Sequence, residues 1–299
     1  MGIVLDEFKN AFQRTNNAHV QLIFINVLVF LVLAVLLVFS TASGYPDFFD
    51  AIHRQLSIPA PFLTFLIKPW TIITYSFVHD LSGIFHILFN MLALYWFGKL
   101  FVEYLGSDKL IALYVLGALA GGVFYLLVYN TIPFYETRIP GGGMVGASAA
   151  VYAVLVATAT LLPDYTFFLL FLGPVRIKYI ALVYIVISFL GSIGGNAGGN
   201  IAHLGGALMG YIYIKQLQVG VNWGGWITVV IDWIKNLFGA SPKVKVTYRK
   251  TEKQAAPPTS KAAKASQDEI DAILDKISDR GYESLTKEEK EKLFNASKK

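Results

Sequence analysis

The chain has 299 residues, of which 55% are hydrophobic and only 15% carry a charge. A soluble domain usually has about a quarter of charged residues, so the composition indicates an integral membrane protein and excludes an ordinary soluble enzyme. The absence of cysteine excludes disulfides, a thiol nucleophile and thiolate metal sites. Of the 25 Lys and Arg residues, 16 lie from Lys215 onward, which marks a basic tail rather than a nucleic-acid groove.

Six apolar runs are long enough to cross a membrane, since a spanning helix needs about 20 mostly apolar residues and fewer inside a bundle. They are Val20–Ser40, Ile84–Phe101, Leu110–Tyr129, Met144–Leu162, Ile177–Leu190 and Ile201–Leu217. Before the fifth run, Phe167–Leu172 and the following Gly-Pro pair predict a segment that dips into the membrane. No small-residue cleavage site accompanies the first run, so we expect no cleavable signal peptide. The fold class is therefore all-α, a polytopic six-helix bundle.

The chain divides into five predicted parts: a cytosolic N-terminal segment (1–19), the six-helix membrane domain (20–217), an amphipathic interfacial helix (218–240), a disordered linker (241–267) and a small helical cytosolic appendage (268–299). Trp223–Phe238 has one apolar face, which is typical of a helix lying on a membrane surface. A seventh span is the alternative, and it would bury two charges. The appendage contains a capping box that begins at Thr286. It either binds a regulatory partner or only adds solubility.

The distribution of Lys and Arg between the short connections predicts that both termini are cytoplasmic. In this orientation the second, fourth and sixth spans all enter the membrane from its outer side. His86, Ser148 and His203 each lie within about five residues of these entries, hence at one depth of roughly 4–8 Å. Their common depth indicates that these three polar side chains meet.

Ser148 follows a glycine-rich run that ends at Gly146, and it opens the fourth span. Free backbone N–H groups and the helix dipole favour a negative oxygen there. His203 is the only ionisable residue of the sixth span apart from tyrosines and the last lysine, and Gly206 and Gly210 allow another helix to approach it. This imidazole can serve as the base for the hydroxyl. Alone, a serine in a span is usually a packing residue and a histidine can be a structural one.

His86 and Asn90 are four residues apart, so they share one face of the second span and can both donate hydrogen bonds to an oxyanion. A polar pair that only bonds a neighbouring helix is the alternative. Tyr152, one turn deeper in the fourth span, can stack beneath His203 or simply pack there. No Asp or Glu lies in the last three spans, so the sequence supports a Ser–His pair without a third, acidic member.

Together these residues resemble the rhomboid family of intramembrane serine proteases, over roughly Trp70 to Leu217. The matching elements are His86-x-x-x-Asn90, Gly146-x-Ser148 and Ala202-His203-x-x-Gly206-x-x-x-Gly210, supported by Asn200, Tyr152 and Glu103-Tyr104-Leu105-Gly106. The resemblance implies a Ser148–His203 dyad with Tyr152 beneath the imidazole. It also implies an oxyanion hole formed by His86, Asn90 and the N–H of Ser148. The family's commonest pattern has Gly after the nucleophile, where this chain has Ala149.

We therefore expect a serine endopeptidase that cleaves transmembrane segments of membrane proteins near the outer face of the bilayer, without cofactor or metal. Its expected partners are transmembrane substrates, the lipid bilayer and a cytosolic protein that binds the tail. Its expected location is a bacterial inner membrane. The main alternative is a catalytically inert rhomboid-like factor that binds or escorts membrane proteins. A transporter is disfavoured because no internal repeat is apparent, and a metal enzyme because no carboxylate joins the two histidines.

Overall fold

The structure is a computed structural model, and it describes residues 16–137, 139, 143–170, 172–238 and 267–296. The chain divides into two compact units, Met1–Ser241 and Pro242–Lys299. Most of the predicted N-terminal segment and almost all of the predicted linker lie outside the described residues, so these two predictions remain untested.

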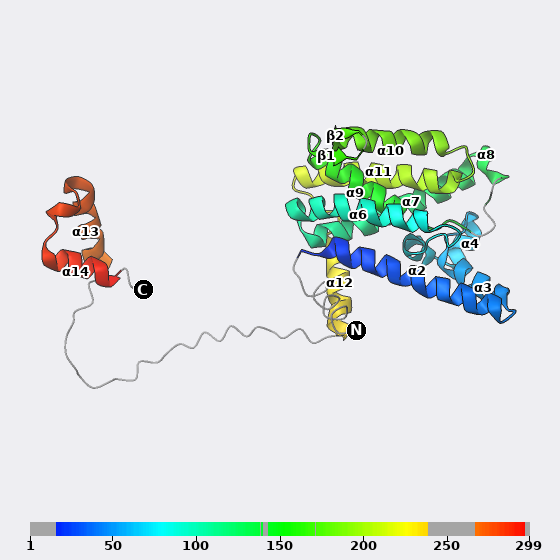
Figure 1. The fold of residues 1–299 in the computed structure, drawn as a ribbon, viewed down its shortest axis with the longest axis horizontal. Coiled ribbons are helices and arrows are strands. Elements are labelled where there is room, and N and C mark those ends of the chain that lie inside the picture. Colours follow the sequence, from blue (N-terminus) through cyan, green and yellow to red (C-terminus); the bar gives the residue numbers. More distant parts are fainter. Residues whose placement is uncertain (1–15, 138, 140–142, 171, 239–266, 297–299) are drawn as a thin grey trace. The chain divides into compact units, whose positions relative to one another are not determined.

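Six helices form the bundle of the first unit and correspond to the six predicted spans (Figure 1). They are α2 (Ala18–Ala42), α6 (Ile84–Leu105), α7 (Ser107–Thr131), α9 (Ser148–Leu161), α10 (Ile177–Gly191) and α11 (Ala197–Gln218). Among the described residues, α2, α6 and α7 are long and apolar enough to cross a membrane, while α9 and α10 are shorter apolar helices. The glycine-rich α11 packs most extensively against α9 and α7. The predicted all-α membrane bundle is confirmed.

Two helix starts differ from the prediction by four residues. The fourth span was expected from Met144, but α9 begins at Ser148. Gly146 has a φ of +138°, which no residue in a right-handed helix adopts, and the backbone of Met144 pairs instead with Ile58. The sixth span begins at Ala197 rather than Ile201, so only residues 192–196 connect α10 to α11.

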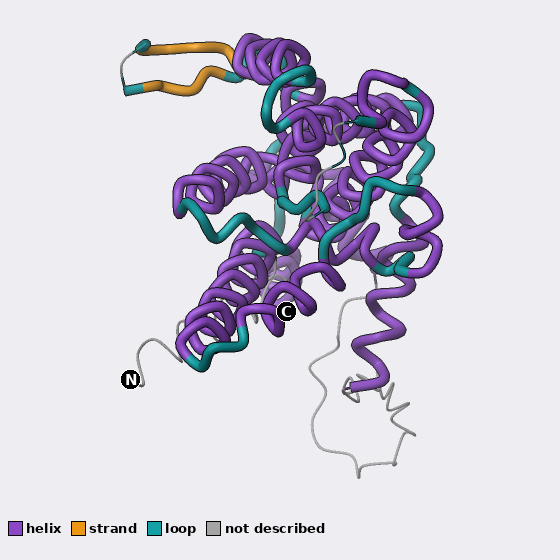
Figure 2. Tube along the Cα trace, turned by 90° about the vertical axis from the view of Figure 1, so that its right-hand side faces the viewer, coloured by secondary structure: helices purple, strands orange, loops and turns teal. Residues whose placement is uncertain are grey.

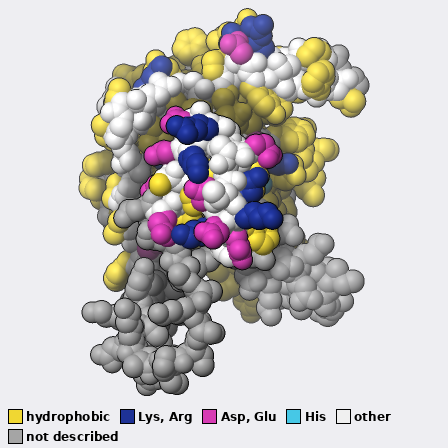
Figure 3. Space-filling model, turned by 90° about the vertical axis from the view of Figure 1, so that its left-hand side faces the viewer, with side chains coloured by type: hydrophobic (Ala, Val, Ile, Leu, Met, Phe, Trp, Pro, Cys, Tyr) yellow, Lys and Arg dark blue, Asp and Glu magenta, His cyan; other side chains and the backbone are white. Residues whose placement is uncertain are grey.

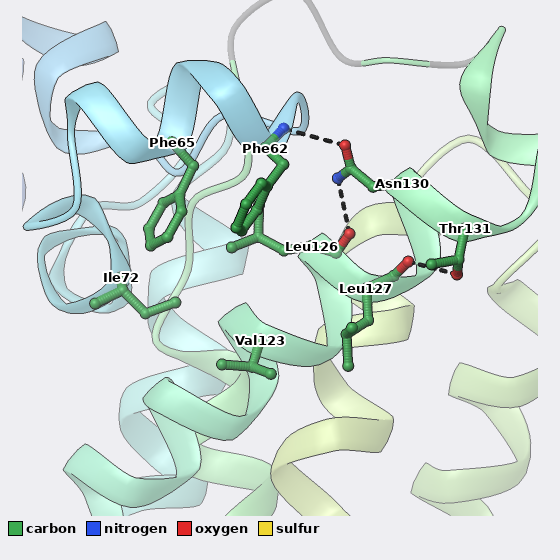
Figure 4. A pocket seen from close by; sticks show the side chains of 8 residues that line it. All are labelled: Phe62, Phe65, Ile72, Val123, Leu126, Leu127, Asn130 and Thr131. Atoms are coloured by element: carbon green, nitrogen blue, oxygen red, sulfur yellow. Dashed lines mark hydrogen bonds between the residues drawn. The ribbon is translucent and has the colours of Figure 1, made fainter.

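The long connection between α2 and α6 contains α3 (Pro46–Leu56), α4 (Phe62–Ile67), α5 (Thr71–Thr74) and the 3-10 turn η1 (Tyr75–Phe77). Figure 4 shows Phe62 and Phe65 facing the side of α7 across a small apolar cavity of about 330 Å³. The amide of Asn130 on α7 fastens this connection, because its oxygen accepts the N–H of Phe62 at 3.1 Å and its nitrogen donates to the carbonyl of Ala60 at 2.8 Å. This amide therefore holds the connection against the bundle from both of its polar atoms.

The segment expected to dip into the membrane forms an antiparallel hairpin of β1 (Thr166–Leu169) and β2 (Gly173–Arg176), and the dip itself stays a prediction. Figure 2 shows the hairpin extending away from the helices, so it does not re-enter the bundle. Its aromatic residues Phe167 and Phe168 suit a strand, and Gly173 has a φ of +70°. Asp164 pairs with Lys178 at 2.7 Å and with Arg176 at 3.2 Å at the base of the hairpin. The hydrogen bond and charge of Lys178 hold the pKa of Asp164 below its usual range.

After α11, the helix α12 (Gly225–Phe238) leaves the bundle with its axis steeply inclined to the bundle helices (Figures 1 and 2). Ile227 is buried, and Gly224, just before the helix, approaches Ala112 of α7 so closely that a side chain there would clash. Trp226 and Trp233 remain exposed. Indole rings are frequent at membrane surfaces, and the interfacial position of this helix stays a prediction.

The second unit contains α13 (Gln267–Arg280), the 3-10 turn η2 (Tyr282–Ser284) and α14 (Lys287–Ala296). The predicted capping box is confirmed, since the N–H of Thr286 donates to the carboxylate of Glu289 at 2.7 Å and the N–H of Glu289 donates to the Thr286 hydroxyl at 3.3 Å. Lys276 of α13 pairs with the same carboxylate at 2.9 Å. Figure 3 shows acidic and basic side chains interspersed over the surface of this unit.

In the first unit, the short helix α8 (Pro133–Glu136) follows α7 and packs against it. The ring of Tyr135 lies 5.2 Å from that of Tyr129, and its hydroxyl donates to the carbonyl of Ser192 at 3.1 Å. This bond ties the connection after α7 to the connection after α10, beside the cavity that contains Ser148.

Candidate active site

Ser148 is the first residue of α9, and its side chain is half-buried. Gly146 turns the chain into the helix with its positive φ, and its N–H donates to the carbonyl of Tyr75 at 3.0 Å. The first four N–H groups of a helix have no partner within that helix. The Ser148 hydroxyl therefore lies beside backbone donors and the positive end of the α9 dipole, where a negative oxygen is stabilised.

His203 of α11 reaches Ser148 because the two helices pack unusually closely. A side chain at Gly206 would overlap the carbonyl of Ala149, and one at Gly210 would overlap the carbonyl of Ala153. Small residues at these two positions let the backbones approach, as in other membrane helix pairs. The result is a distance of 2.6 Å between His203 Nε2 and Ser148 Oγ.

Two further side chains surround the imidazole of His203. The ring of Tyr152 is stacked on it, with ring centroids 4.2 Å apart and planes 14° apart. The hydroxyl oxygen of Ser188, on α10, lies 3.1 Å from His203 Nδ1. That hydroxyl donates to the Tyr152 hydroxyl at 2.8 Å. The sequence analysis predicted the tyrosine beneath the histidine, but it did not single out Ser188.

The two predicted oxyanion donors, His86 and Asn90, differ in their position relative to Ser148. A methyl group on Gly146 would lie 3.3 Å from Ser148 Oγ and 3.4 Å from Cε1 of His86, so the imidazole and the hydroxyl flank the same glycine. His86 and Ser148 also line one cavity. Asn90 is buried, and its amide nitrogen donates to the carbonyl of His86 at 2.8 Å. The structure therefore brings His86 to Ser148 and directs the amide of Asn90 toward its own helix.

Asn200 bonds backbone carbonyls near the ends of α10 and α11 and does not contact the Ser148–His203 pair. Its amide donates to the carbonyl of Gly191 at 3.0 Å and to that of Asn196 at 2.9 Å. A side chain at Gly191 would collide with Asn200, since a Cβ there would lie 2.6 Å from the amide nitrogen. Asn200 thus fastens the end of α10 to the first turn of α11, one turn before His203.

A cavity of about 1280 Å³ lies over Ser148 and His86. Its wall includes the glycine-rich segment 193–199 and three ionisable residues, Asp50, His53 and Asp80. The carboxylate of Asp80 accepts the N–H of Ser82 at 2.8 Å, and this bond holds the pKa of Asp80 below its usual range. Burial lowers the pKa of His53, although both nearby carboxylates oppose the shift. No group of three or more His, Asp or Glu residues within the described ranges is arranged to hold a metal ion.

A further histidine, His79, lies directly behind His86. It is fully buried, and its ring meets that of His86 edge-on with centroids 5.5 Å apart. Burial lowers the pKa of His79 to about 4, so its ring is neutral at physiological pH. A neutral ring in this position holds His86 in place without adding a charge. Its position late in the first loop, ahead of His86, was the only signal for it in the sequence.

Comparison with known proteins identifies the membrane unit. The profile of the rhomboid domain matches residues 67–218, about half of the chain. A second profile, a family of unknown function (DUF6576), matches residues 260–299.

Several curated relatives match the same region. RHOMBOID-like protein 12, mitochondrial, of Arabidopsis thaliana is 35% identical over 162 residues, which are 50% of this chain and 47% of the relative. Rhomboid protein 1, mitochondrial, of Saccharomyces cerevisiae is 33% identical over 152 residues, 48% of this chain and 40% of the relative. Rhomboid protease GlpG of Haemophilus influenzae is 31% identical over 144 residues, 48% of this chain and 67% of the relative. The chain thus spans about half or less of the first two relatives. Since the profile covers half of its length and its apolar helices form the expected bundle, the chain belongs to the rhomboid family of membrane-embedded proteins.

Proposed function

We propose that this rhomboid-family protein is an intramembrane serine endopeptidase in which Ser148 is the nucleophile and His203 the general base. The observation that carries the proposal is the 2.6 Å distance between His203 Nε2 and Ser148 Oγ, which is within hydrogen-bonding range for proton transfer. The relative named a protease, GlpG, supports it, because two thirds of that protein is matched.

The first half of the reaction forms an acyl-enzyme. As Ser148 Oγ attacks the scissile carbonyl carbon, His203 Nε2 takes the hydroxyl proton, and the carbonyl oxygen becomes an oxyanion. The backbone N–H groups that open α9 and the ring of His86 stabilise this charge. The C–N bond then breaks, and His203 gives its proton to the leaving amine. In the second half, His203 deprotonates a water molecule that attacks the ester, and Ser148 recovers its proton.

Hydrolysis needs water, which the hydrocarbon interior of a bilayer lacks. The cavity over Ser148 supplies the space for it, since it is lined by connections and by residues near the ends of helices rather than by the middle of the spans. A transmembrane substrate that unwinds at this level would present an extended backbone to Ser148. This position favours cleavage near the outer face of the membrane, in the orientation predicted from the Lys and Arg distribution.

A catalytically inert membrane-protein binding factor is the second candidate, because the two mitochondrial relatives are named as rhomboid or rhomboid-like proteins and not as proteases. The relatives also come from organelles as well as from a bacterium, so the comparisons support a membrane location without supporting a bacterial inner membrane. The expected cytosolic partner of the C-terminal unit gains no support from a family of unknown function.

The test uses purified full-length protein in liposomes with a generic transmembrane substrate and a fluorophosphonate probe. Wild type is expected to cleave the substrate and to be labelled, whereas Ser148→Ala and His203→Ala lose cleavage by at least about 10³-fold. The binding-factor alternative predicts substrate capture with no cleavage and no labelling of Ser148. Cleavage that persists in Ser148→Ala would overturn the proposal.

A further inference from the structure

Ser188 is a fully buried hydroxyl that the proposed reaction does not yet use. It lies in the last turn of α10, and among the non-aromatic side chains of the apolar run Ile177–Leu190 it is the only uncharged polar one. Its oxygen contacts two members of the site, His203 Nδ1 at 3.1 Å and the hydroxyl of Tyr152 at 2.8 Å. A hydroxyl at this position is paired on both sides and excluded from solvent.

The direction of these bonds is set by the backbone carbonyl of Tyr184, which can only accept a hydrogen bond from the Tyr152 hydroxyl. A serine hydroxyl has one proton and two acceptor positions. The Ser188 proton is donated to the Tyr152 oxygen, and the Tyr152 proton is directed to the backbone carbonyl of Tyr184 at 3.4 Å. The Ser188 oxygen is then an acceptor toward His203, so the hydrogen on this imidazole lies on Nδ1.

This direction has a consequence at the other ring nitrogen. A neutral imidazole with its hydrogen on Nδ1 has a free lone pair on Nε2. Nε2 is the atom 2.6 Å from Ser148 Oγ, so it can accept the proton of the nucleophile. In the opposite tautomer Nε2 would carry a hydrogen and could not act as the base.

We propose that Ser188 is the positioning residue of this site: an uncharged hydroxyl that takes the place of a triad carboxylate and fixes His203 in its base-competent tautomer. The chain of bonds runs from Ser148 through His203, Ser188 and Tyr152 to the carbonyl of Tyr184. It involves no formal charge, which suits a site inside a membrane bundle, where a buried carboxylate is costly. The proposal rests on the proposed function, since it assigns Ser188 a part in the same reaction.

Two variants separate this role from a merely structural one. Ser188→Ala removes the acceptor from Nδ1, and we expect kcat to fall about 10–100-fold while KM changes less than twofold, because substrate contacts are untouched. Ser188→Thr keeps the hydroxyl and is expected to retain more activity than Ser188→Ala. Thr158→Val is the matched control, because it removes another fully buried hydroxyl that bonds only backbone carbonyls.

The proton chain predicts a specific coupling with Tyr152. Tyr152→Phe keeps the stacked ring but removes the acceptor of the Ser188 proton, which is then free to turn toward Nδ1. We expect this change to lower kcat in the wild-type background and to have no further effect on kcat in Ser188→Ala, because the two residues act through one path. Additive losses in the double variant would contradict the chain.

A spectroscopic measurement keeps the inference separate from the proposed function. In ¹⁵N-histidine-labelled protein in liposomes, the His203 signals, assigned by their loss in His203→Ala, are expected to show a protonated Nδ1 and an unprotonated Nε2. In Ser188→Ala they should shift toward a mixture of tautomers. A tautomer unchanged by Ser188→Ala, or a kcat within twofold of wild type, overturns the inference. A fixed tautomer in a protein that cleaves nothing would sustain the role of Ser188 while removing the protease proposal.

Discussion

His86 and Asn90 lie on one face of α6, but they have different surroundings. His86 is half-buried, lines the cavity with Ser148 and is supported from behind by the ring of His79. Asn90 is buried, does not line that cavity and donates to the carbonyl of His86. His86 is therefore placed to act directly on an oxyanion, whereas Asn90 stabilises the turn of helix that presents it.

This difference predicts unequal effects of truncation. His86→Ala is expected to lower kcat by about 10²–10³-fold, the loss typical of removing one oxyanion donor. Asn90→Ala is expected to lower kcat by less than about tenfold, since it loses a local hydrogen bond. Initial rates over a range of substrate concentrations decide between them, with thermal unfolding of each variant as the control for folding. Equal losses in kcat would show that both side chains donate, as the spacing in the sequence alone suggested.

Ser188 shows where residue patterns stop being informative. Ser148, His203 and Tyr152 were predicted because their spacing and depth matched known catalytic chemistry, and the structure brings all three together. The usual third member of a catalytic triad is a carboxylate, and none lies in the last three spans. A single serine in an apolar run gave no indication of a role beside His203. Its depth in the membrane could have indicated the role, because Ser188 lies near the outer end of its span, as His203 does. Contact between α10 and α11 at that depth is a property of the folded bundle.

At the scale of the helices, α7, α9 and α11 form an interface of small residues. Gly121 of α7 faces the methyl group of Ala149, and a Cβ at Gly121 would lie 2.5 Å from it. The alanine that replaces the family's usual glycine is thus accommodated by a glycine on α7. One turn earlier on α7, Gly117 faces the methyl group of Ala153 in the same way. The position of the dyad therefore depends on matched pairs of glycine and alanine.

A compensating pair tests this interface. Gly117→Ala is expected to destabilise the bundle by about 1–3 kcal/mol, because a second methyl group would overlap that of Ala153. Ala153→Gly in the same chain removes the overlap and is expected to restore at least half of the lost stability. The measurement is the thermal unfolding midpoint of both single variants and the double variant in detergent. If the two effects simply add, the two positions are not in contact.

The elements themselves were predictable to different degrees. Hydropathy located the six bundle helices because a span must bury its own backbone polar groups, which gives a long apolar run. It could not separate the hairpin from a dipping segment, since Phe167–Leu172 is apolar in either structure. It also placed the start of α11 at Ile201 and missed the four preceding residues, Ala197–Asn200. Their small and polar side chains lower the hydropathy, whereas in the folded bundle Gly198 packs against Tyr125 and Asn200 against Gly191.

At the scale of the whole molecule, the two compact units are stabilised by different interactions. The membrane unit relies on a continuous apolar core and close backbone approach. The C-terminal unit is small, and its described helices are joined by charged side chains, with Glu289 bonded both to Lys276 and to the N–H of Thr286. These bonds hold the pKa of Glu289 below its usual value of 4.5, and the bond to Lys276 has the largest effect. The two units should therefore respond differently to acid.

A depressed carboxyl pKa stabilises the folded state above the unfolded-state pKa, and this contribution is lost as pH falls through the folded-state value. We therefore expect amide exchange in α13 and α14, corrected for its intrinsic pH dependence, to accelerate once pH falls below about 4.5. Glu289→Gln removes the titrating group, so its exchange should be faster than wild type at neutral pH and change less on acidification. Hydrogen-exchange mass spectrometry on the full chain makes the comparison, with peptides of α9 as the internal reference. Equal acceleration in wild type and Glu289→Gln would mean that another group controls the acid response of this unit.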